Sequence, residues 1–163
     1  MKKITPARLK NIALYYLERY DASSQKLRDV LYRRLAKARL EQLIPKEASK
    51  WIEDVIAEMI RLGYINDKRF TENQVRRLSD AGKSRSFIRT KLKLAGIDED
   101  EITNALSDTD ELASARLMVQ KKHLGTDFKR DLARLARAGF SYETAREALE
   151  ELHSFADNSE NYV

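Results

Sequence analysis

The 163-residue sequence contains no cysteine, and this absence removes several kinds of chemistry at once. Disulfide bridges, cysteine nucleophiles and thiolate metal sites all require a thiol. A chain without thiols also fits a reducing compartment, so we expect a cytoplasmic protein.

Glycine and proline are scarce, with 5 and 2 residues respectively. Charged residues make up 35% of the chain and apolar residues 42%. This profile favours long exposed helices over strands and tight turns, and it supplies enough apolar surface for a folded core. We therefore predict an all-α protein, built as one domain or as a short row of smaller units.

Long apolar runs are missing as well. Arg8 and Lys10 interrupt the segment MKKITPARLK before any apolar run develops, and no span of about 18 apolar residues occurs anywhere. We expect neither a secretion signal nor a membrane-spanning helix.

Apolar residues recur with the 3.6-residue period of a helix almost throughout, and short breaks divide this pattern into about nine helices. Glycines, a proline and small polar residues that can cap a helix mark the breaks. The predicted helices run from about Ile12 to Tyr20, from Ser23 or Ser24 through Leu35, from Pro45 to Gly63, from Asn66 or Asp67 to Gly82, from Ser84 or Ser86 to Gly96, from Asp98 through Leu106, and near 112–122, 128–138 and 142–152. Asp98 and Glu101 predict a capping box at the sixth start.

One stretch of the chain is repeated. KLKLAGIDEDEITNAL at 91–106 returns as RLARAGFSYETAREAL at 134–149, an offset of 43 residues. An earlier copy aligns Leu27 and Leu31 with Ile88 and Leu92 at an offset of 61, so it contains an insertion. A three-helix segment of this size cannot bury its apolar face alone, so neighbouring copies must stack or share a core.

This repetition predicts three tandem three-helix repeats. The expected divisions are 1–62 with an insertion near 35–48, 63–108, 109–153, and a flexible tail at 154–163.

Each repeated turn could belong to a DNA-reading helix-turn-helix, but the charges argue against it. Residues 98–111 hold seven acidic residues and no basic one, and Glu143 and Glu147 line the corresponding later helix. A recognition helix approaches two rows of phosphates, which these carboxylates would repel. The glycine of the turn has a simpler use, because it ends a helix in the left-handed conformation and lets Ile97 or Phe140 pack back onto the core.

Basic residues gather instead on the helices before the turn. Residues 68–93 hold nine of them against two acidic residues, a local charge of +7. Arg85, Arg89 and Lys93 form a stripe at every fourth position, with Phe87, Ile88, Leu92 and Leu94 on the other side of the helix. Such a surface suits phosphates or an acidic protein groove, although helix faces of opposite charge could also pair with one another.

Catalytic and metal-binding patterns are not evident. His123 and His153 stand thirty residues apart, and the Gly-Lys-Ser sequence at 82–84 lacks the upstream glycine of a phosphate loop. Tyr15, Tyr16, Trp51 and Phe70 could stack on bases, yet helix packing is the expected use of most of them. We predict a protein that is not an enzyme and that needs no cofactor or metal.

GYINDKRFTENQV at 63–75, IRTKLKLAGIDEDEI at 88–102 and AGFSYETAREAL at 138–149 together resemble the RecX regulators of the bacterial RecA recombinase. The chain departs from the family pattern at Ala95 and Ala138, where a basic residue is usual, and at Gly82-Lys83, where Gly-Pro is usual.

The resemblance implies tandem three-helix repeats in a curved, elongated monomer. It further implies a protein that lies along the groove of the recombinase filament on single-stranded DNA. There it would repress ATP hydrolysis, strand exchange and coprotease activity, and so regulate DNA repair, recombination and the SOS response.

The expected site residues fall into two sets. For binding the filament or DNA we expect Arg69, Arg76, Arg77, Lys83, Arg85, Arg89 and Lys93. As fold determinants we expect Gly63, Tyr64, Asp67, Phe70, Gly96, Ile97, Gly139 and Phe140. Two other interpretations are open: a basic module that binds single- or double-stranded DNA without a recombinase, and a scaffold whose acidic faces hold basic partners.

Overall fold

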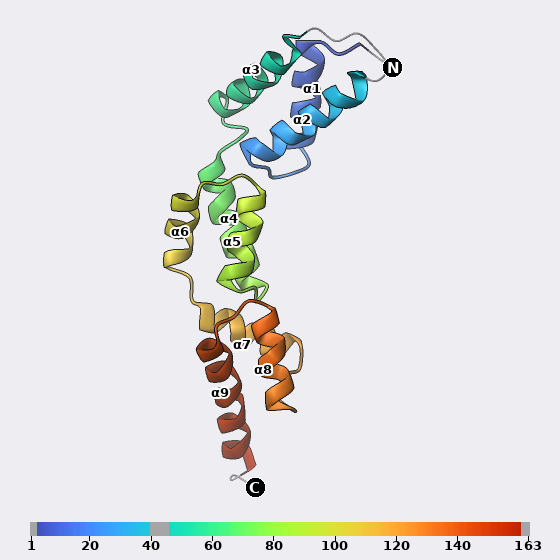
Figure 1. Ribbon diagram of the computed structural model, residues 1–163. Coiled ribbons are helices and arrows are strands. Elements are labelled where there is room, and N and C mark those ends of the chain that lie inside the picture. Colours follow the sequence, from blue (N-terminus) through green and yellow to red (C-terminus); the bar gives the residue numbers. More distant parts are fainter. Residues whose placement is uncertain (1–2, 40–45, 161–163) are drawn as a thin grey trace. The chain divides into compact units, whose positions relative to one another are not determined.

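The computed structural model describes residues 3–39 and 46–160, and this part of the chain is helical without strands (Figure 1). Its helices are α1 Pro6–Leu17, α2 Ser24–Arg39, α3 Ala48–Arg61, α4 Asp67–Asp80, α5 Arg85–Leu94, α6 Glu99–Ser107, α7 Glu111–Lys121, α8 Phe128–Arg137 and α9 Tyr142–Glu160. The all-α prediction is confirmed.

The helix boundaries depart from the prediction at both ends. α1 begins at Pro6, earlier than the predicted start near Ile12, because Thr5 caps it by accepting the Arg8 N–H at 3.2 Å. α9 continues to Glu160 instead of ending near Leu152, since no glycine or proline follows to stop it. Pro45, the predicted start of the third helix, lies outside the described residues.

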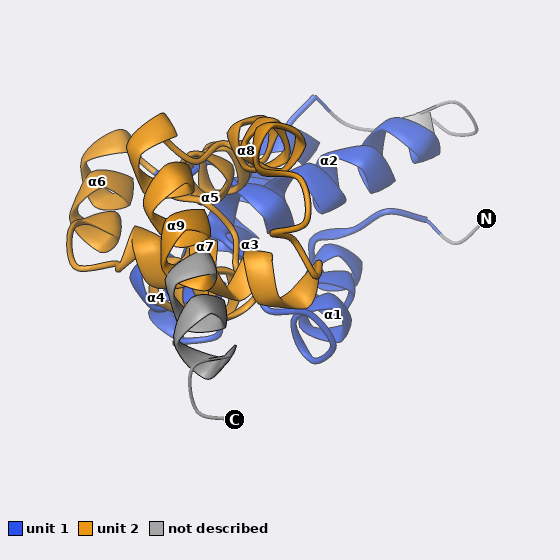
Figure 2. Ribbon diagram, turned by 90° about the horizontal axis from the view of Figure 1, so that it is seen from below, with its two compact units in different colours: residues 1–70, 95–97 blue, residues 71–94, 98–163 orange. Residues whose placement is uncertain are grey.

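The chain forms two compact units (Figure 2). Unit 1 takes residues up to 70 together with 95–97, and unit 2 takes 71–94 together with the chain from 98 onward. Each unit therefore contains one segment that lies, in the sequence, between two segments of the other unit. These segments are 95–97 in unit 1 and 71–94 in unit 2.

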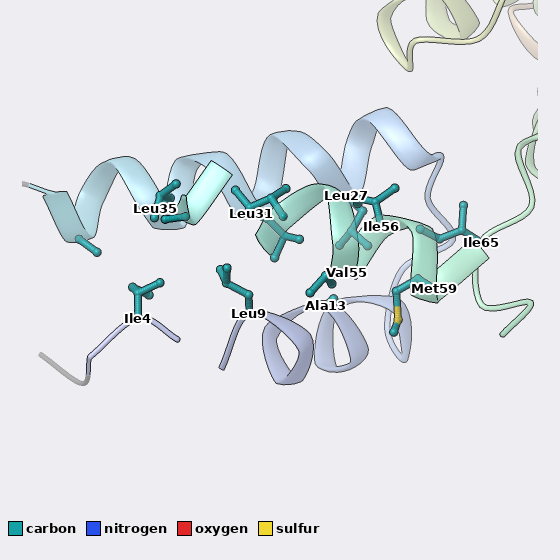
Figure 3. Close-up of a cluster of buried hydrophobic side chains, with 13 residues drawn as sticks. Ile4, Leu9, Ala13, Leu27, Leu31, Leu35, Val55, Ile56, Met59 and Ile65 are labelled. Atoms are coloured by element: carbon teal, nitrogen blue, oxygen red, sulfur yellow. The ribbon is translucent and has the colours of Figure 1, made fainter. Parts of the chain in front are cut away.

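Unit 1 has its core between α1, α2 and α3 (Figure 3). Leu27, Leu31 and Leu35 of α2 recur at every fourth position, and each is fully or almost fully buried. They pack in one cluster with residues of the other two helices, chiefly Leu9, Ala13, Ile52, Ile56 and Met59.

Gly63 ends α3 at a φ of +76°, where a side chain would be strained. The Tyr64 N–H then reaches back to the Met59 carbonyl at 3.0 Å, which closes the helix end. Tyr64 itself is exposed, so its side chain contributes little to the core.

Asp67 does not cap its own helix. Asn66 does so, accepting the Arg69 N–H at 2.9 Å. Asp67 instead accepts two bonds from Ser24, the backbone N–H at 2.7 Å and the hydroxyl at 2.6 Å, at the start of α2. Its carboxylate thereby ties α4 to α2.

Unit 2 buries residues from α7, α8 and α9 in one cluster that includes Val119, Leu124, Leu135, Phe140 and Leu149. On α5 and α6, Ile88, Leu92, Ile102 and Leu106 are buried as well. The apolar positions common to the two aligned segments thus face inward in both copies.

A serine and a glycine turn meet in the same way at two places. Within unit 1, the Ser23 hydroxyl caps α2 and donates to the Ala95 carbonyl at 2.5 Å. Within unit 2, the Ser84 hydroxyl caps α5 and donates to the Ala138 carbonyl at 2.6 Å. We call each arrangement a serine–glycine joint, because Gly96 or Gly139 follows the accepting carbonyl.

The glycines of these joints are needed for close approach as well as for their backbone angle. A Cβ on Gly96 would lie 2.4 Å from the Gln25 Cβ, and one on Gly139 would lie 2.7 Å from the Ser84 Oγ. Both distances are below van der Waals contact, so a side chain at either position would push the joint apart.

A buried carboxylate that the sequence did not reveal organises the loop before α8. Asp131 accepts the Gly125 N–H at 2.8 Å and the Asp127 N–H at 3.5 Å, and Arg134 lies 3.4 Å away. The Gly125 N–H is the main cause that lowers the pKa of Asp131, with burial acting against it. The ionised carboxylate is therefore part of the fold.

Candidate basic binding surface

The basic residues of α4 are exposed, and two of them bond to side-chain amides of the same helix. Arg76 donates to the Asn73 side chain at 3.0 Å and Arg77 to the Gln74 side chain at 2.6 Å, both in unit 2. Arg69, in unit 1, is exposed beside the capped start of the helix. Among the described residues, no carboxylate forms a salt bridge with these three guanidinium groups.

The predicted stripe on α5 is largely engaged inside unit 2. The Arg85 guanidinium donates to the Thr109 hydroxyl at 2.8 Å and to the Thr109 carbonyl, while its backbone N–H donates to Glu111 at 3.1 Å. These bonds use Arg85 to hold the start of α5 against the start of α7.

Arg89 and Lys93, the other two stripe residues, share one carboxylate. Lys93 Nζ lies 2.7 Å from Glu99 Oε2, and Arg89 forms a salt bridge with Glu99 Oε1. Lys93 and then Arg89 lower the pKa of Glu99, which is therefore ionised at neutral pH. The pairing of helix faces that we considered as an alternative is thus present along this stripe.

The opposite flank of α5 has a different character. Lys83 and Lys91 place their ammonium groups 5.2 Å and 5.5 Å from the centre of the Phe87 ring. Leu94 was expected on the apolar side of the helix, but 70% of its surface is exposed. The reason is that α5 buries only a narrow line through Ile88 and Leu92, which leaves Leu94 beyond the packed surface.

The helices that follow the glycine turns are acidic at their starts, as predicted. α6 opens with Glu99, Asp100 and Glu101, whose charges suit the positive end of the helix dipole. The predicted capping box is wrong in its second half. Asp98 accepts the Asp100 N–H at 2.9 Å, whereas Glu101 Oε1 is buried and has no hydrogen-bond partner among the residues that the structure describes.

Basic residues also line a hollow in the last part of unit 2. A cavity of about 460 Å³ has Met118 and Leu124 as its apolar lining and Lys122, Arg134 and Arg137 as its cations. The sequence does not reveal this hollow, because the hollow depends on how α7 and α8 pack.

Arg116 and Glu151 form a second paired site in unit 2. Two bonds of 2.5 Å and 2.6 Å join the guanidinium to the carboxylate at the edge of a cavity of about 930 Å³. The Arg116 guanidinium lowers the pKa of Glu151. This pair spans 35 residues and was not evident from the sequence.

The aromatic residues considered for base stacking differ in how exposed they are. Phe70 is buried, Tyr16 and Trp51 pack partly against the unit 1 core, and Tyr15 is 56% exposed. The Arg19 guanidinium covers the Tyr15 ring at 3.9 Å. Only Tyr15 of the four is thus presented to solvent.

Within the described residues, no group of three or more histidines or carboxylates could hold a metal ion. His123 is exposed at the end of α7, and the side chain of His153 lies outside the described part. None of the helices in that part is long and apolar enough to cross a membrane.

Each comparison with known proteins finds proteins or domains named RecX. A family profile described as "RecX, second three-helix domain" matches residues 66–106. The chain is 33% identical to the "Regulatory protein RecX" of Myxococcus xanthus over 91% of this chain and 88% of that protein. It is 28% identical to the protein of the same name from Agrobacterium fabrum, over 82% and 77% of the two chains.

A solved structure has the same fold. The crystal structure of RecX from Lactobacillus salivarius superposes with a TM-score of 0.69 at 23% identity, and the match covers 91% of this chain and 96% of that one.

Proposed function

Because the chain belongs to the RecX family of regulatory proteins, we propose that it binds the filament of a RecA-type recombinase on single-stranded DNA. There it represses ATP hydrolysis, strand exchange and coprotease activity, and through them regulates DNA repair, recombination and the SOS response. The observation that carries the proposal is the similarity to the Myxococcus xanthus protein over nearly the full length of both chains.

The charge distribution supports binding to a partner that is at least partly acidic. Exposed guanidinium groups on α4 have no carboxylate partners among the described residues, so little competes with an incoming anion. Phosphates would repel the acidic starts of α6 and α9, so these helix starts would face away from the DNA. This repulsion favours one orientation of the protein on the filament.

We propose that the basic residues of α4, α5 and the turn before α5 bind the filament or DNA, and that they contribute unequally to the affinity. The set is Arg69, Arg76, Arg77, Lys83, Arg85, Arg89 and Lys93. Arg85 acts mainly by positioning α5, because its guanidinium is already bonded to Thr109. Arg89 and Lys93 are partly neutralised by Glu99.

In this proposal the protein is a cytoplasmic monomer that acts by binding, without catalysis, metal or cofactor. The measurement that tests it is steady-state ATP hydrolysis by the recombinase of the same organism on single-stranded DNA. We expect inhibition when this protein is present well below the recombinase concentration, because a regulator of filaments need not match every subunit. Unchanged hydrolysis, with the protein shown to be folded, would refute the proposal.

A second candidate function is direct nucleic-acid binding without a recombinase. The exposed Tyr15 ring with its stacked Arg19 favours it, since such pairs stack on unpaired bases. Phosphate binding weakens by roughly 0.9 log unit per log unit of salt for each duplex phosphate contacted. A steep salt dependence on bare DNA, without inhibition of the recombinase, would favour this candidate.

A further inference from the structure

The two flanks of α5 carry similar numbers of cations but differ in what surrounds them. The first flank is the stripe of Arg85, Arg89 and Lys93, and its charged groups are bonded to Glu99 and Thr109. The second consists of Lys83, Phe87, Lys91 and Leu94, at successive spacings of four, four and three residues, and we call it the Phe87 face. The helix period places these two flanks on either side of the buried line through Ile88 and Leu92.

Within the described part of the chain, the cations on the Phe87 face have no acidic partner. Among the described residues, neither Lys83 nor Lys91 forms a salt bridge, and both ammonium groups rest near the Phe87 ring. The ring limits their motion without neutralising them, so less side-chain freedom is lost when an anion binds.

The Phe87 face is also apolar where an ordinary phosphate-binding surface would be polar. Leu94 is the most exposed of the large apolar residues that the structure describes, at 70%, and Phe87 is half-buried between the two lysines. Nucleic-acid phosphates gain nothing from an exposed leucine, whereas a protein segment with an apolar side chain among carboxylates satisfies both features.

We propose that the Phe87 face docks an acidic segment of the recombinase that carries an apolar side chain. Carboxylates of that segment pair with Lys83 and Lys91, and its apolar side chain covers Leu94 and the Phe87 ring. This inference deepens the proposed function and rests on it, because it names which surface of α5 meets the protein part of the filament.

The test compares removal of charge on the Phe87 face with removal of the same charge at lysines outside the assigned binding set. Recombinase filaments are assembled on a dT oligonucleotide with a non-hydrolysable ATP analogue, and binding of fluorescently labelled protein is followed by anisotropy. The test variants are Lys83→Gln with Lys91→Gln, and separately Leu94→Ala. The matched control is Lys50→Gln with Lys129→Gln, which removes the same charge at two exposed lysines outside the assigned binding set. All altered side chains are at least partly exposed, and circular dichroism checks that each variant is folded.

We expect the lysine pair to weaken filament binding at least tenfold, Leu94→Ala to weaken it severalfold, and the control to change it less than threefold. If wild type binds but all variants match the control, the Phe87 face is not the docking surface and the proposed function stands. If the lysine pair weakens binding to bare oligonucleotide equally and Leu94→Ala changes neither, the face binds nucleic acid and the inference is overturned. If wild type itself does not bind filaments, the proposed function fails, and the inference fails with it.

Discussion

The hydroxyl of Ser84 serves two elements at once, since it accepts the Phe87 N–H and donates to the Ala138 carbonyl. We predict that Ser84→Ala lowers the free energy of unfolding by about 1–3 kcal/mol, because it removes a helix cap and leaves a carbonyl of the joint without its donor. Urea unfolding followed by circular dichroism measures this. Ser86→Ala, on the exposed side of the same turn, is the control and should change stability by less than about 0.5 kcal/mol. Equal effects of the two changes would contradict the role given to Ser84.

Gly139 and Gly63 differ in why the position requires a glycine. Both have positive φ, but a Cβ would meet Ser84 and Ser86 at Gly139, whereas nothing lies within 4 Å at Gly63. We predict that Gly63→Ala costs about 1–2 kcal/mol from backbone strain alone. Gly139→Ala should cost clearly more, because a clash adds to the strain. Similar losses in urea unfolding would show that the joint can relax around the extra methyl group.

Asp131 predicts an acid-sensitive contribution to stability. The folded chain lowers the pKa of this carboxyl, so its ionised form stabilises the fold above the unfolded value of about 3.9, and the contribution is lost as the pH falls below it. The groups that face it are the Gly125 and Asp127 N–H groups and Arg134, with Arg130 further away.

Wild type should therefore lose more of its urea midpoint between pH 7 and about pH 3.5 than Asp131→Asn does. The asparagine keeps an acceptor oxygen but cannot be protonated in this range. Parallel loss in both proteins would assign acid sensitivity to other carboxylates.

At the scale of the helices, sequence reasoning succeeded where a local signal exists and failed where a choice depends on packing. Gly63, Gly82 and Gly96 mark helix ends in the sequence, and each has positive φ in the structure. The cap of α4 was left between Asn66 and Asp67 because both suit the position. Only the contact with Ser24, 43 residues away, explains why Asp67 is used elsewhere.

The charged surface was predicted less well than the helices for the same reason. A helical wheel shows that Arg85, Arg89 and Lys93 share a flank, but it cannot show that Glu99 and Thr109 will neutralise or hold them. The wheel also assigned Leu94 to the core side, since it treats the buried arc as equally wide in every helix. The neighbouring helix determines which cations stay available to bind a partner.

The buried line of α2 gives a prediction at the scale of this helix. Leu31 is fully buried among residues of the unit 1 core, so Leu31→Ala should cost about 2–5 kcal/mol. Tyr32→Ala changes the adjacent, exposed residue and serves as the control, with an expected loss below about 1 kcal/mol. Comparable losses would mean that α2 does not pack as described.

At the scale of the whole molecule, the division into units does not coincide with a single cut in the chain. The boundary near residue 70 falls inside α4, and residues 95–97 belong to unit 1 although unit 2 flanks them on both sides. Because α4 runs through this boundary and segments of the two units alternate in the sequence, we expect the two units to unfold together.

The single tryptophan allows this to be measured. Trp51 packs against the unit 1 core, so its fluorescence reports unit 1, while circular dichroism reports all helices. We predict coincident urea transitions by the two probes, and we predict that Leu135→Ala in unit 2 shifts both of them. A tryptophan transition that stays in place while the dichroism midpoint falls would show independent units.

The serine–glycine joint affects how a protein of this kind can gain further repeats by gene duplication. Each joint uses a hydroxyl at the start of one helix and a carbonyl beside a glycine at the end of another, and the segment from Ser84 to Gly139 carries both kinds of end. Duplicating one 43-residue module in the gene would therefore create a new donor and a new acceptor together. Lengthening by whole modules should be tolerated at a point where insertion of a few residues would break a joint.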